Sequence, residues 1–307
     1  MIFTQIIIWG HTSRISHTHY WIHYAFNRAF KYMKYNTIWL PDKPLSSNKL
    51  KITENTLFIT EGQCDKYIPI DATCYYILHN CKNKYNKIPN NQIILLQVYT
   101  NSVLIKMEKF IKYDDFMYYN LDRDRCICYM PWATDILPDE IDKNISNIDN
   151  IFNFKKNNAQ FIGSIWNGEF GNVHQINKYK IECQKNSIPF SNYTKISMEK
   201  NIKLIQESKY SPTIVGEWQQ IRGYIPCRAF KNISYGGYCI TNSKEVYEIF
   251  EKKVCYDPDC SKLFYKGKEY INQMTKEKII DLMNIVKNKH TYINRVQFLL
   301  RGFELSI

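Results

Sequence analysis

The stretch GYIPCRAFKNISYGGYCITNS, residues 223–243, decides the fold. Pro226 is well tolerated in the first turn of a helix, and apolar positions then recur at helical spacing up to Tyr235. Two glycines at 236–237 end this helix, and residues 238–241 form a short strand. A loop, a helix, a glycine stop and a strand make half of an α/β unit. The helix N-terminus is the usual place for such a unit to hold a phosphate.

The rest of the chain repeats this alternation. At 307 residues it exceeds the usual size of one hydrophobic core, so two domains are expected. We predict two doubly wound α/β domains, residues 1–138 and 159–307, joined by a polar linker over residues 139–158. The predicted strands are 2–9, 37–40, 56–60, 74–78, 92–98 and 126–130, then 160–164, 193–196, 212–215 and 238–241. The predicted helices are 20–33, 172–186, 198–208, 226–235, 276–289 and 292–303.

Charge and cysteine content narrow the class of protein. The net charge is +12, but the lysines are scattered and cluster only in short pairs, so a solvated basic surface is favoured over a nucleic-acid site. The ten cysteines lack the paired spacing of a zinc site, and so many thiols favour a reducing compartment. Without a signal peptide or an apolar run of about 18 residues, we expect a cytoplasmic protein with no transmembrane segment.

Two cations lie one turn apart at the start of the helix at 226–235. Arg228 and Lys231 are both expected to bind a diphosphate. The helix, which reads R-x-F-K, resembles the donor-binding segment of group 1 glycosyltransferases with the GT-B fold, nearest the spore-maturation-type branch, where it reads R-x-F-E. The F-I-G-S at 161–164 resembles the opening of the same donor domain. The H-T-Y-x-x-R at 290–295 resembles the family's closing helix, which often crosses back to the first domain.

The resemblance implies two Rossmann-like domains facing a cleft. It also implies transfer of a sugar from a nucleotide-activated donor to a glycan, protein or small-molecule acceptor, with retention and without a cofactor or metal ion. One departure stands out, because the family's two glutamates, eight positions apart, fall here on Gly223 and Lys231. The ribose contact would then come from Glu217, Glu245 or the main chain, or the donor differs, or the chain is an inactive copy.

Further donor-binding candidates follow the strands of the second domain, because ligands of open α/β sheets sit beyond the carboxyl ends of strands. A glycine-bearing loop after 160–164 leads into a helix start, and Trp218 could stack on a nucleobase. The candidates in this domain are Gly163, Asn172, Glu217, Trp218, Arg222, Arg228, Lys231, Asn242 and Ser243.

The first domain supplies the candidate catalytic groups. Gly10 and His11 follow the first strand and are expected to contact the donor. His17, His19 and His79 lie at the same edge, where an imidazole can act as a general base near neutral pH. The spacing H-x5-H-x-H matches no known metal triad and brings no carboxylate, so no metal is expected.

Three other classes of function remain as alternatives to a glycosyltransferase. A dinucleotide-dependent oxidoreductase is disfavoured because no G-x-G-x-x-G follows the first strand. A basic nucleic-acid-binding protein would use the +12 charge. A catalytically inactive GT-B-like protein would bind the donor without turnover.

Overall fold

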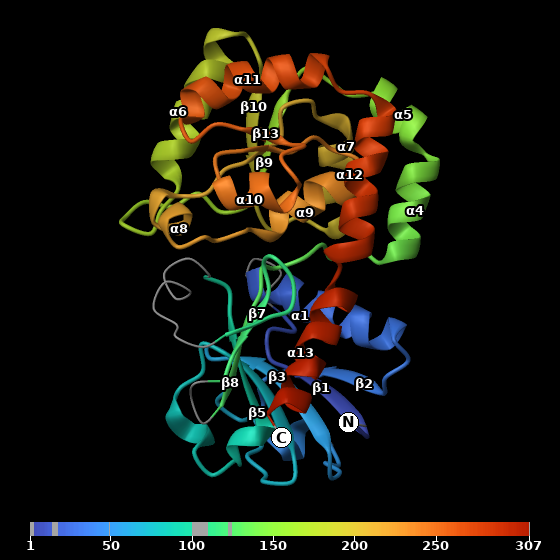
Figure 1. The fold of residues 1–307 in the computed structure, drawn as a ribbon, viewed down its shortest axis with the longest axis vertical. Helices are drawn as coiled ribbons and strands as arrows, with labels where there is room; N and C mark the ends of the chain where they lie inside the picture. The colour runs from blue at the N-terminus through green and yellow to red at the C-terminus, as the bar shows by residue number, and fades with distance from the viewer. Residues whose placement is uncertain (1–2, 14–17, 49, 100–109, 122–124, 307) are drawn as a thin grey trace. The chain divides into compact units, whose positions relative to one another are not determined.

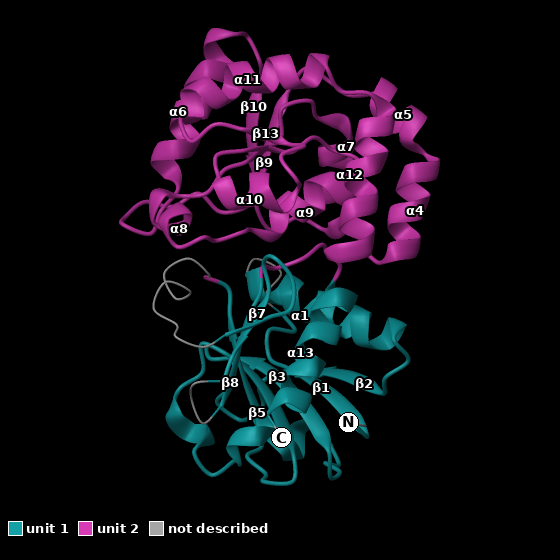
Figure 2. Cartoon of the chain, in the orientation of Figure 1, with its two compact units in different colours: residues 1–98, 103–130, 292–307 teal, residues 99–102, 131–291 magenta. Residues whose placement is uncertain are grey.

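The computed structural model describes residues 3–13, 18–48, 50–99, 110–121 and 125–306 (Figure 1). The chain divides into two compact units (Figure 2). Unit 1 comprises residues 1–98, 103–130 and 292–307, and unit 2 comprises residues 99–102 and 131–291. None of the described helices combines the length and hydropathy that a bilayer-spanning segment requires.

Unit 1 is built on one eight-stranded sheet in the order β2-β1-β3-β4-β5-β8-β7-β6. The six strands from β2 to β8 are parallel, and β7 and β6 add an antiparallel edge. Continuous apolar runs such as QIIIW suit strands that are buried on both faces. The strands are β1 (Gln5–Trp9), β2 (Thr37–Leu40), β3 (Thr56–Glu61), β4 (Tyr75–His79), β5 (Ile93–Gln97), β6 (Ile111–Lys112), β7 (Tyr118–Asn120) and β8 (Cys126–Tyr129).

Helices cover one face of this sheet. Helix α1 (Thr18–Tyr32) packs beside α13 (Tyr292–Leu305), with the rings of Phe26 and Tyr292 4.8 Å apart. A Cβ on Gly302 of α13 would lie 2.9 Å from Ile94, so the absence of a side chain lets the helix approach β5 closely. The other face carries an apolar cluster that includes Trp9, and the segments that follow β3 and β4 contribute to it. These segments contain the 3-10 helices η1 (Asn83–Tyr85) and η2 (Asn90–Gln92); α2 (Leu45–Asn48) follows β2.

Unit 2 holds two small parallel sheets. Strand β9 (Ala159–Ile162) pairs with β10 (Phe190–Tyr193), and β12 (Ile240–Thr241) lies between β11 (Pro212–Thr213) and β13 (Cys255–Tyr256). Helices surround these sheets, and α6 lies beside α11 (Figure 1). They are α4 (Pro138–Ser146), α5 (Ile148–Asn153), α6 (Val173–Lys185), α7 (Met198–Glu207), α8 (Glu217–Ile221), α9 (Cys227–Ser234), α10 (Lys244–Ile249), α11 (Cys260–Asn272) and α12 (Lys276–Lys289).

The elements differ from the sequence-based boundaries in a few places. The strand predicted at 193–196 lies at Phe190–Tyr193, because Lys195 has a positive φ of 56° and Ser197 already caps α7. The polar segment 139–158 carries helices α4 and α5 within unit 2, since its few isoleucines are buried at helical spacing.

Candidate functional site

Arg228, in the first turn of α9, is the central cation of unit 2. Its Nε donates to the carbonyl of Ile162 at 2.8 Å and its Nη1 to that of Ile214 at 3.3 Å, so it joins the ends of β9 and the segment after β11. The guanidinium lies over the ring of Phe161 at 4.0 Å. Burial lowers the pKa of Arg228, and no carboxylate of the described chain forms an ion pair with it.

Glycines allow the loops around Arg228 to approach one another. A Cβ on Gly163, where φ is 147°, would lie 2.2 Å from Nη2 of Arg228. A Cβ on Gly216 would lie 2.2 Å from the carbonyl oxygen of Gly171. The loop after β9 and the loop after β11 are therefore in backbone contact beside Arg228.

Two asparagines fix these loops. Asn172, just before α6, accepts a hydrogen bond from the Trp166 backbone N–H and donates to the Ser164 carbonyl, both at 3.2 Å. Asn242 accepts from the N–H of Val215 and donates to its carbonyl, both at 2.9 Å. Both predicted donor-binding asparagines thus hold loops in place with their side chains.

Two more of the predicted donor-binding residues, Ser243 and Glu217, have partners within unit 2. Ser243 caps α10, and its Oγ accepts from Val246 N at 3.3 Å. Glu217 accepts from Nε2 of Gln175 at 2.7 Å.

Trp218 lies on α8, and Arg222 follows directly after the last residue of this helix. The guanidinium of Arg222 lies 4.3 Å from the Trp218 ring centroid. The rings of Phe170 and Tyr99 meet Trp218 edge-on at 4.9 and 5.1 Å. Trp218 is therefore held in an aromatic cluster of unit 2.

Lys231, one turn beyond Arg228, has a counter-ion. Its Nζ lies 2.6 Å from Oδ2 of Asp135, and the hydroxyl of Tyr235 donates to Oδ1 at 2.5 Å. Burial alone would lower the pKa of Lys231, but the Asp135 charge outweighs it and raises the pKa. Lys231 is a buried ion-pair partner, in contrast to Arg228.

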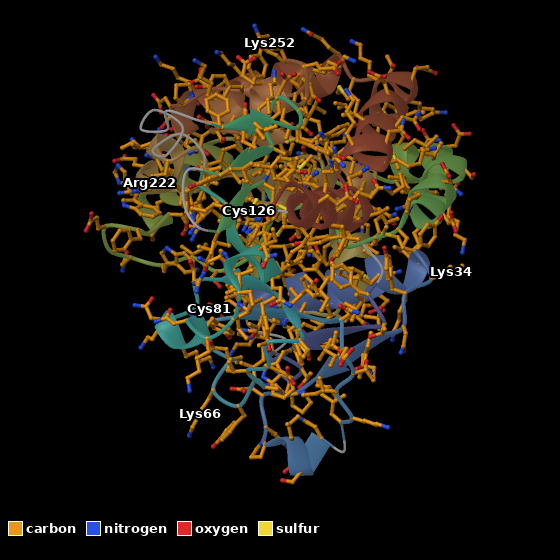
Figure 3. The ribbon with its side chains drawn as sticks, turned by 60° about the horizontal axis from the view of Figure 1, so that its bottom comes forward. Lys34, Lys66, Cys81, Cys126, Arg222 and Lys252 are labelled. Atoms are coloured by element: carbon orange, nitrogen blue, oxygen red, sulfur yellow. The ribbon has the colours of Figure 1, made fainter. Side chains whose placement is uncertain are left out.

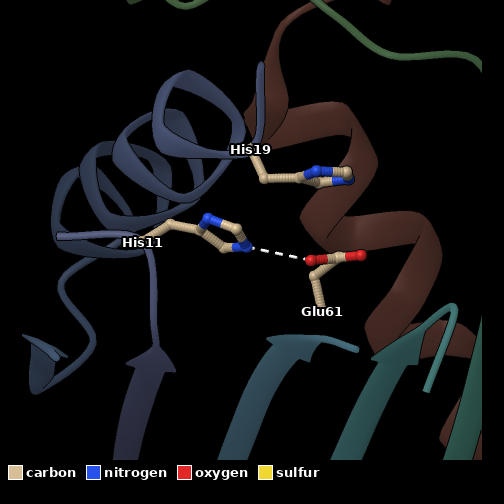
Figure 4. Close-up of side chains that lie close together, drawn as sticks. All are labelled: His11, His19 and Glu61. Atoms are coloured by element: carbon tan, nitrogen blue, oxygen red, sulfur yellow. Dashed lines mark hydrogen bonds and ion pairs between the residues drawn. The ribbon is translucent and has the colours of Figure 1, made fainter. Parts of the chain in front are cut away.

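Unit 1 gathers imidazoles and one carboxylate at the carboxyl ends of β1, β3 and β4. Figure 4 shows His11 pointing at Glu61, with Nε2 2.9 Å from Oε2. Glu61 also accepts from the backbone N–H of Gln63 at 3.0 Å. Both side chains are buried, and Gly10 precedes His11 in a left-handed turn with φ of 88°. A Cβ on Gly10 would lie 2.6 Å from the carbonyl oxygen of Cys64, so only glycine fits there.

Three further histidines pack around this pair. The ring of His19, in the first turn of α1, stacks on His11 at 5.4 Å, and His23 meets His11 edge-on at 5.1 Å. His79, at the end of β4, lies 5.3 Å from His19. Its Nδ1 is 3.0 Å from the Leu96 carbonyl, and its Nε2 is 3.1 Å from Nδ2 of Asn80.

The surroundings fix the charges of this cluster. Burial, reinforced by His79, lowers the pKa of His19 to about 3, and burial with His11 lowers that of His23 to about 3. Burial also lowers the pKa of His79. Burial raises the pKa of Glu61, but the hydrogen bond from His11 and the interaction with His19 outweigh it, and the net shift is downward. At neutral pH, therefore, His19, His23 and His79 are neutral and surround an ionised carboxylate.

The structure thus brings together His11, His19 and His79 of the predicted residues, while His17 lies outside the described residues. Sequence reasoning missed His23 and Glu61. Glu61 ends a buried strand, a position that could have marked it, but only the strand order places β3 beside β1 and so brings Glu61 to His11.

No protein-family model matches the sequence, and no curated protein matches it either. Several solved structures do share its fold. The DNA-modifying enzyme β-glucosyltransferase superposes with a TM-score of 0.53 at 11% identity, over 98% of this chain and 99% of that one. An α,α-trehalose-phosphate synthase (UDP-forming) from Burkholderia xenovorans, in complex with glucose-6-phosphate, gives 0.51 at 8% identity, over 94% and 80%. The α,α-trehalose 6-phosphate synthase from Burkholderia multivorans gives 0.51 at 8%, over 94% and 76%.

Identities this low establish the fold alone. They leave the spore-maturation-type branch as a prediction. The predicted fold class is confirmed: the chain has the α/β fold of the GT-B glycosyltransferases, with two Rossmann-like domains.

Proposed function

We propose that the protein transfers a sugar from a nucleotide-activated donor to an acceptor hydroxyl, and that unit 2 binds the donor diphosphate at Arg228. One observation carries the proposal. Arg228 is a half-buried guanidinium at the N-terminus of α9 that forms no ion pair with any described carboxylate. A guanidinium that is partly withdrawn from water and has no counter-ion is costly, and a bound phosphate would offset that cost.

The geometry around Arg228 supports an anionic ligand. Its Nη2 end fills the space that a side chain on Gly163 would occupy, so the guanidinium lies directly against the loop after β9. Contacts to Ile162 and Ile214 orient the guanidinium at the carboxyl ends of parallel strands, the usual ligand edge of an open α/β sheet. Trp218 with Arg222 is the proposed site for the nucleobase.

The test is nucleotide binding to the full chain, measured by calorimetry with nucleoside diphosphates and nucleotide sugars. A charge-assisted hydrogen bond is worth about 1.5–3 kcal/mol, so Arg228→Ala should weaken binding by about 10- to 150-fold. Lys180→Ala, which removes an exposed lysine of the same unit, is the control and should bind like the wild type. Affinity of Arg228→Ala within twofold of wild type, with the fold intact, would place the donor elsewhere.

We further propose that the histidine cluster of unit 1 acts on the acceptor, with His19 as its principal member. His79 is held by the Leu96 carbonyl and by Asn80, which gives it a mainly structural part. His19 is a neutral imidazole at neutral pH and can accept a hydrogen bond from the acceptor hydroxyl. His19→Ala should lower kcat by about tenfold, the worth of one hydrogen bond, and should leave donor affinity unchanged. Full turnover in this variant would mean that other residues act on the acceptor.

Retention of anomeric configuration and a metal-independent donor site complete the proposal, as the family resemblance implies. The configuration of the product, read by NMR, tests retention. Gly223 and Lys231 stand at the two positions where the resembled family has glutamates, and Lys231 is paired with Asp135. Because neither position offers a carboxylate, they favour one alternative, a protein that binds the donor without turnover. Donor binding without transfer to any acceptor would support that alternative.

A basic nucleic-acid-binding protein is the weaker alternative. The exposed lysines Lys34 and Lys66 project from separate parts of unit 1 (Figure 3). Binding to nucleic acid that falls log-linearly with salt would favour this alternative.

A further inference from the structure

The carboxylate of Glu61 is a buried charge that faces imidazoles. Its exposed fraction is 2%, and its hydrogen bonds come from His11 and from the backbone of Gln63. Within the described ranges, no lysine or arginine forms an ion pair with it. A buried anion of this kind calls for a positive partner.

Two imidazoles next to Glu61 complete a set of metal-ligating atoms. One ligand atom each from His11, His19 and Glu61 lies within 4.8 Å of the others (Figure 4). The Nε2 of His11 and the Oε2 of Glu61 are 2.9 Å apart. Two ligands bound at ~2.1 Å to a tetrahedral ion lie ~3.4 Å apart, so only a small adjustment brings this pair onto one ion.

The three ligands sit on elements that fix their positions. Glu61 is the last residue of β3, His11 follows β1 in a left-handed turn, and His19 lies in the first turn of α1. The parallel pairing of β1 with β3 brings two of the three to one sheet edge. Ligands held on a scaffold in this way bind a metal with little reorganisation.

Neighbouring side chains contact the imidazole rings of His11 and His19. Sγ of Cys64 lies 3.7 Å from Nδ1 of His11, so Nδ1 can carry the proton when Nε2 coordinates an ion. His23 packs edge-on against His11, and His79 packs against His19. Such outer contacts restrict the ring orientations that a metal site requires.

We propose that His11, His19 and Glu61 bind one divalent transition-metal ion, of which Zn²⁺ is the best match. Two imidazole nitrogens and one carboxylate oxygen suit Zn²⁺ and its neighbours better than Mg²⁺ or Ca²⁺, which take mainly oxygen ligands. Three protein ligands leave a fourth position for water or a ligand hydroxyl, as in catalytic zinc sites. In the metal-free protein the hydrogen bond between Nε2 of His11 and Oε2 of Glu61 occupies the place of the ion. This site does not depend on glycosyl transfer.

The test uses the full chain, stripped with a chelator and titrated with Zn²⁺ and, as a spectroscopic probe, Co²⁺. We expect one equivalent of tightly bound Zn²⁺ by competition with a chromophoric chelator, and an intense tetrahedral-type Co²⁺ absorption. Glu61→Gln keeps an oxygen that accepts the His11 hydrogen bond, so it should fold normally. It should bind Zn²⁺ at least about 100-fold more weakly, a larger loss than removal of an outer-sphere partner usually causes. His19→Ala should behave in the same way.

His174→Ala is the matched control, because it removes an exposed histidine of unit 2 outside the cluster, and it should bind Zn²⁺ like the wild type. Circular dichroism of each metal-free variant separates loss of the site from loss of the fold. The proposal is overturned if folded Glu61→Gln retains wild-type affinity or the wild-type Co²⁺ spectrum, or if the wild type binds no stoichiometric ion.

Discussion

At the scale of single residues, the two cations of α9 have opposite surroundings. Lys231 is paired with Asp135, whose other oxygen accepts from Tyr235, whereas Arg228 contacts backbone carbonyls. Replacing Lys231 with Met would leave the Asp135 charge buried and without its ion-pair partner. Breaking a buried pair in this way costs about 3–5 kcal/mol, and we expect that loss in the free energy of unfolding measured with urea.

The double variant Lys231→Met/Asp135→Asn separates charge from packing. The amide that Asp135→Asn introduces is neutral, and its oxygen could still accept the Tyr235 hydrogen bond, so the double variant should recover much of the lost stability. If Lys231→Met unfolds within about 1 kcal/mol of wild type, the pair is more solvated than its geometry indicates.

Lys155 provides a pH-dependent test of burial. Its Nζ donates to the Gln206 carbonyl at 3.1 Å and lies 4.9 Å from the Tyr238 ring centroid. Burial lowers its pKa to about 7. Between pH 7 and the unfolded value of about 10.4, the unfolded chain binds more protons, so stability rises with pH.

We therefore expect the wild type to gain stability relative to Lys155→Met as the pH rises from about 7 towards 10, with no further change in the difference below pH 7. Urea unfolding of both proteins across this range measures the difference, and titrations common to both cancel. A difference that does not depend on pH would show that Lys155 stays charged in the folded protein.

At the scale of elements, the contact between the two loops beside Arg228 depends on Gly216. Its φ is −73°, which suits any residue, so Gly216→Ala tests only the 2.2 Å approach of a Cβ to the Gly171 carbonyl. Gly168 is the matched control, because its φ is 97° and a Cβ there meets nothing within 4 Å. Gly168→Ala should cost about 1–2 kcal/mol of backbone strain and leave nucleotide affinity unchanged.

Gly216→Ala must instead separate the two loops, so it should weaken nucleotide binding by at least about tenfold, equivalent to about 1.4 kcal/mol. Calorimetry on the two variants decides the point. Equal affinities would mean that the contact between the loops plays no part in donor binding.

The sequence predicted elements well where one pattern dominates. Strand Thr37–Leu40 and helix Lys276–Lys289 lie where they were predicted, because each combines a clear period with a clear stop. Helix Cys260–Asn272 was missed, although Asp259 caps it and Leu263 and Phe264 are buried. The site was predicted less completely. Local patterns mark residues that end strands, but the neighbours of Glu61 and the partner of Lys231 depend on which distant segments pack together.

At the scale of the whole molecule, the short segment 99–102 leaves unit 1 for unit 2 and returns, and the chain otherwise passes between the units at Met130–Pro131 and at Thr291–Tyr292. Within unit 2 these two segments adjoin. Thr134 forms a parallel bridge with Thr291, and its N–H donates to the His290 carbonyl at 3.1 Å. Residues 139–158, which were predicted to link the two domains, carry α4 and α5 inside unit 2, so the paired crossing segments are the better candidates for a hinge.

We predict that a saturating nucleotide sugar closes the two units about these crossing segments. Ligands that contact both domains of a two-domain enzyme favour the closed arrangement by their differential affinity for it. Small-angle X-ray scattering should show a smaller radius of gyration with the donor than without it. Arg228→Ala, at the same donor concentration, should keep the unliganded value, because it should bind little donor. If scattering is unchanged while calorimetry confirms saturation, closure is absent, and the acceptor-side groups of unit 1 would have to act without domain movement.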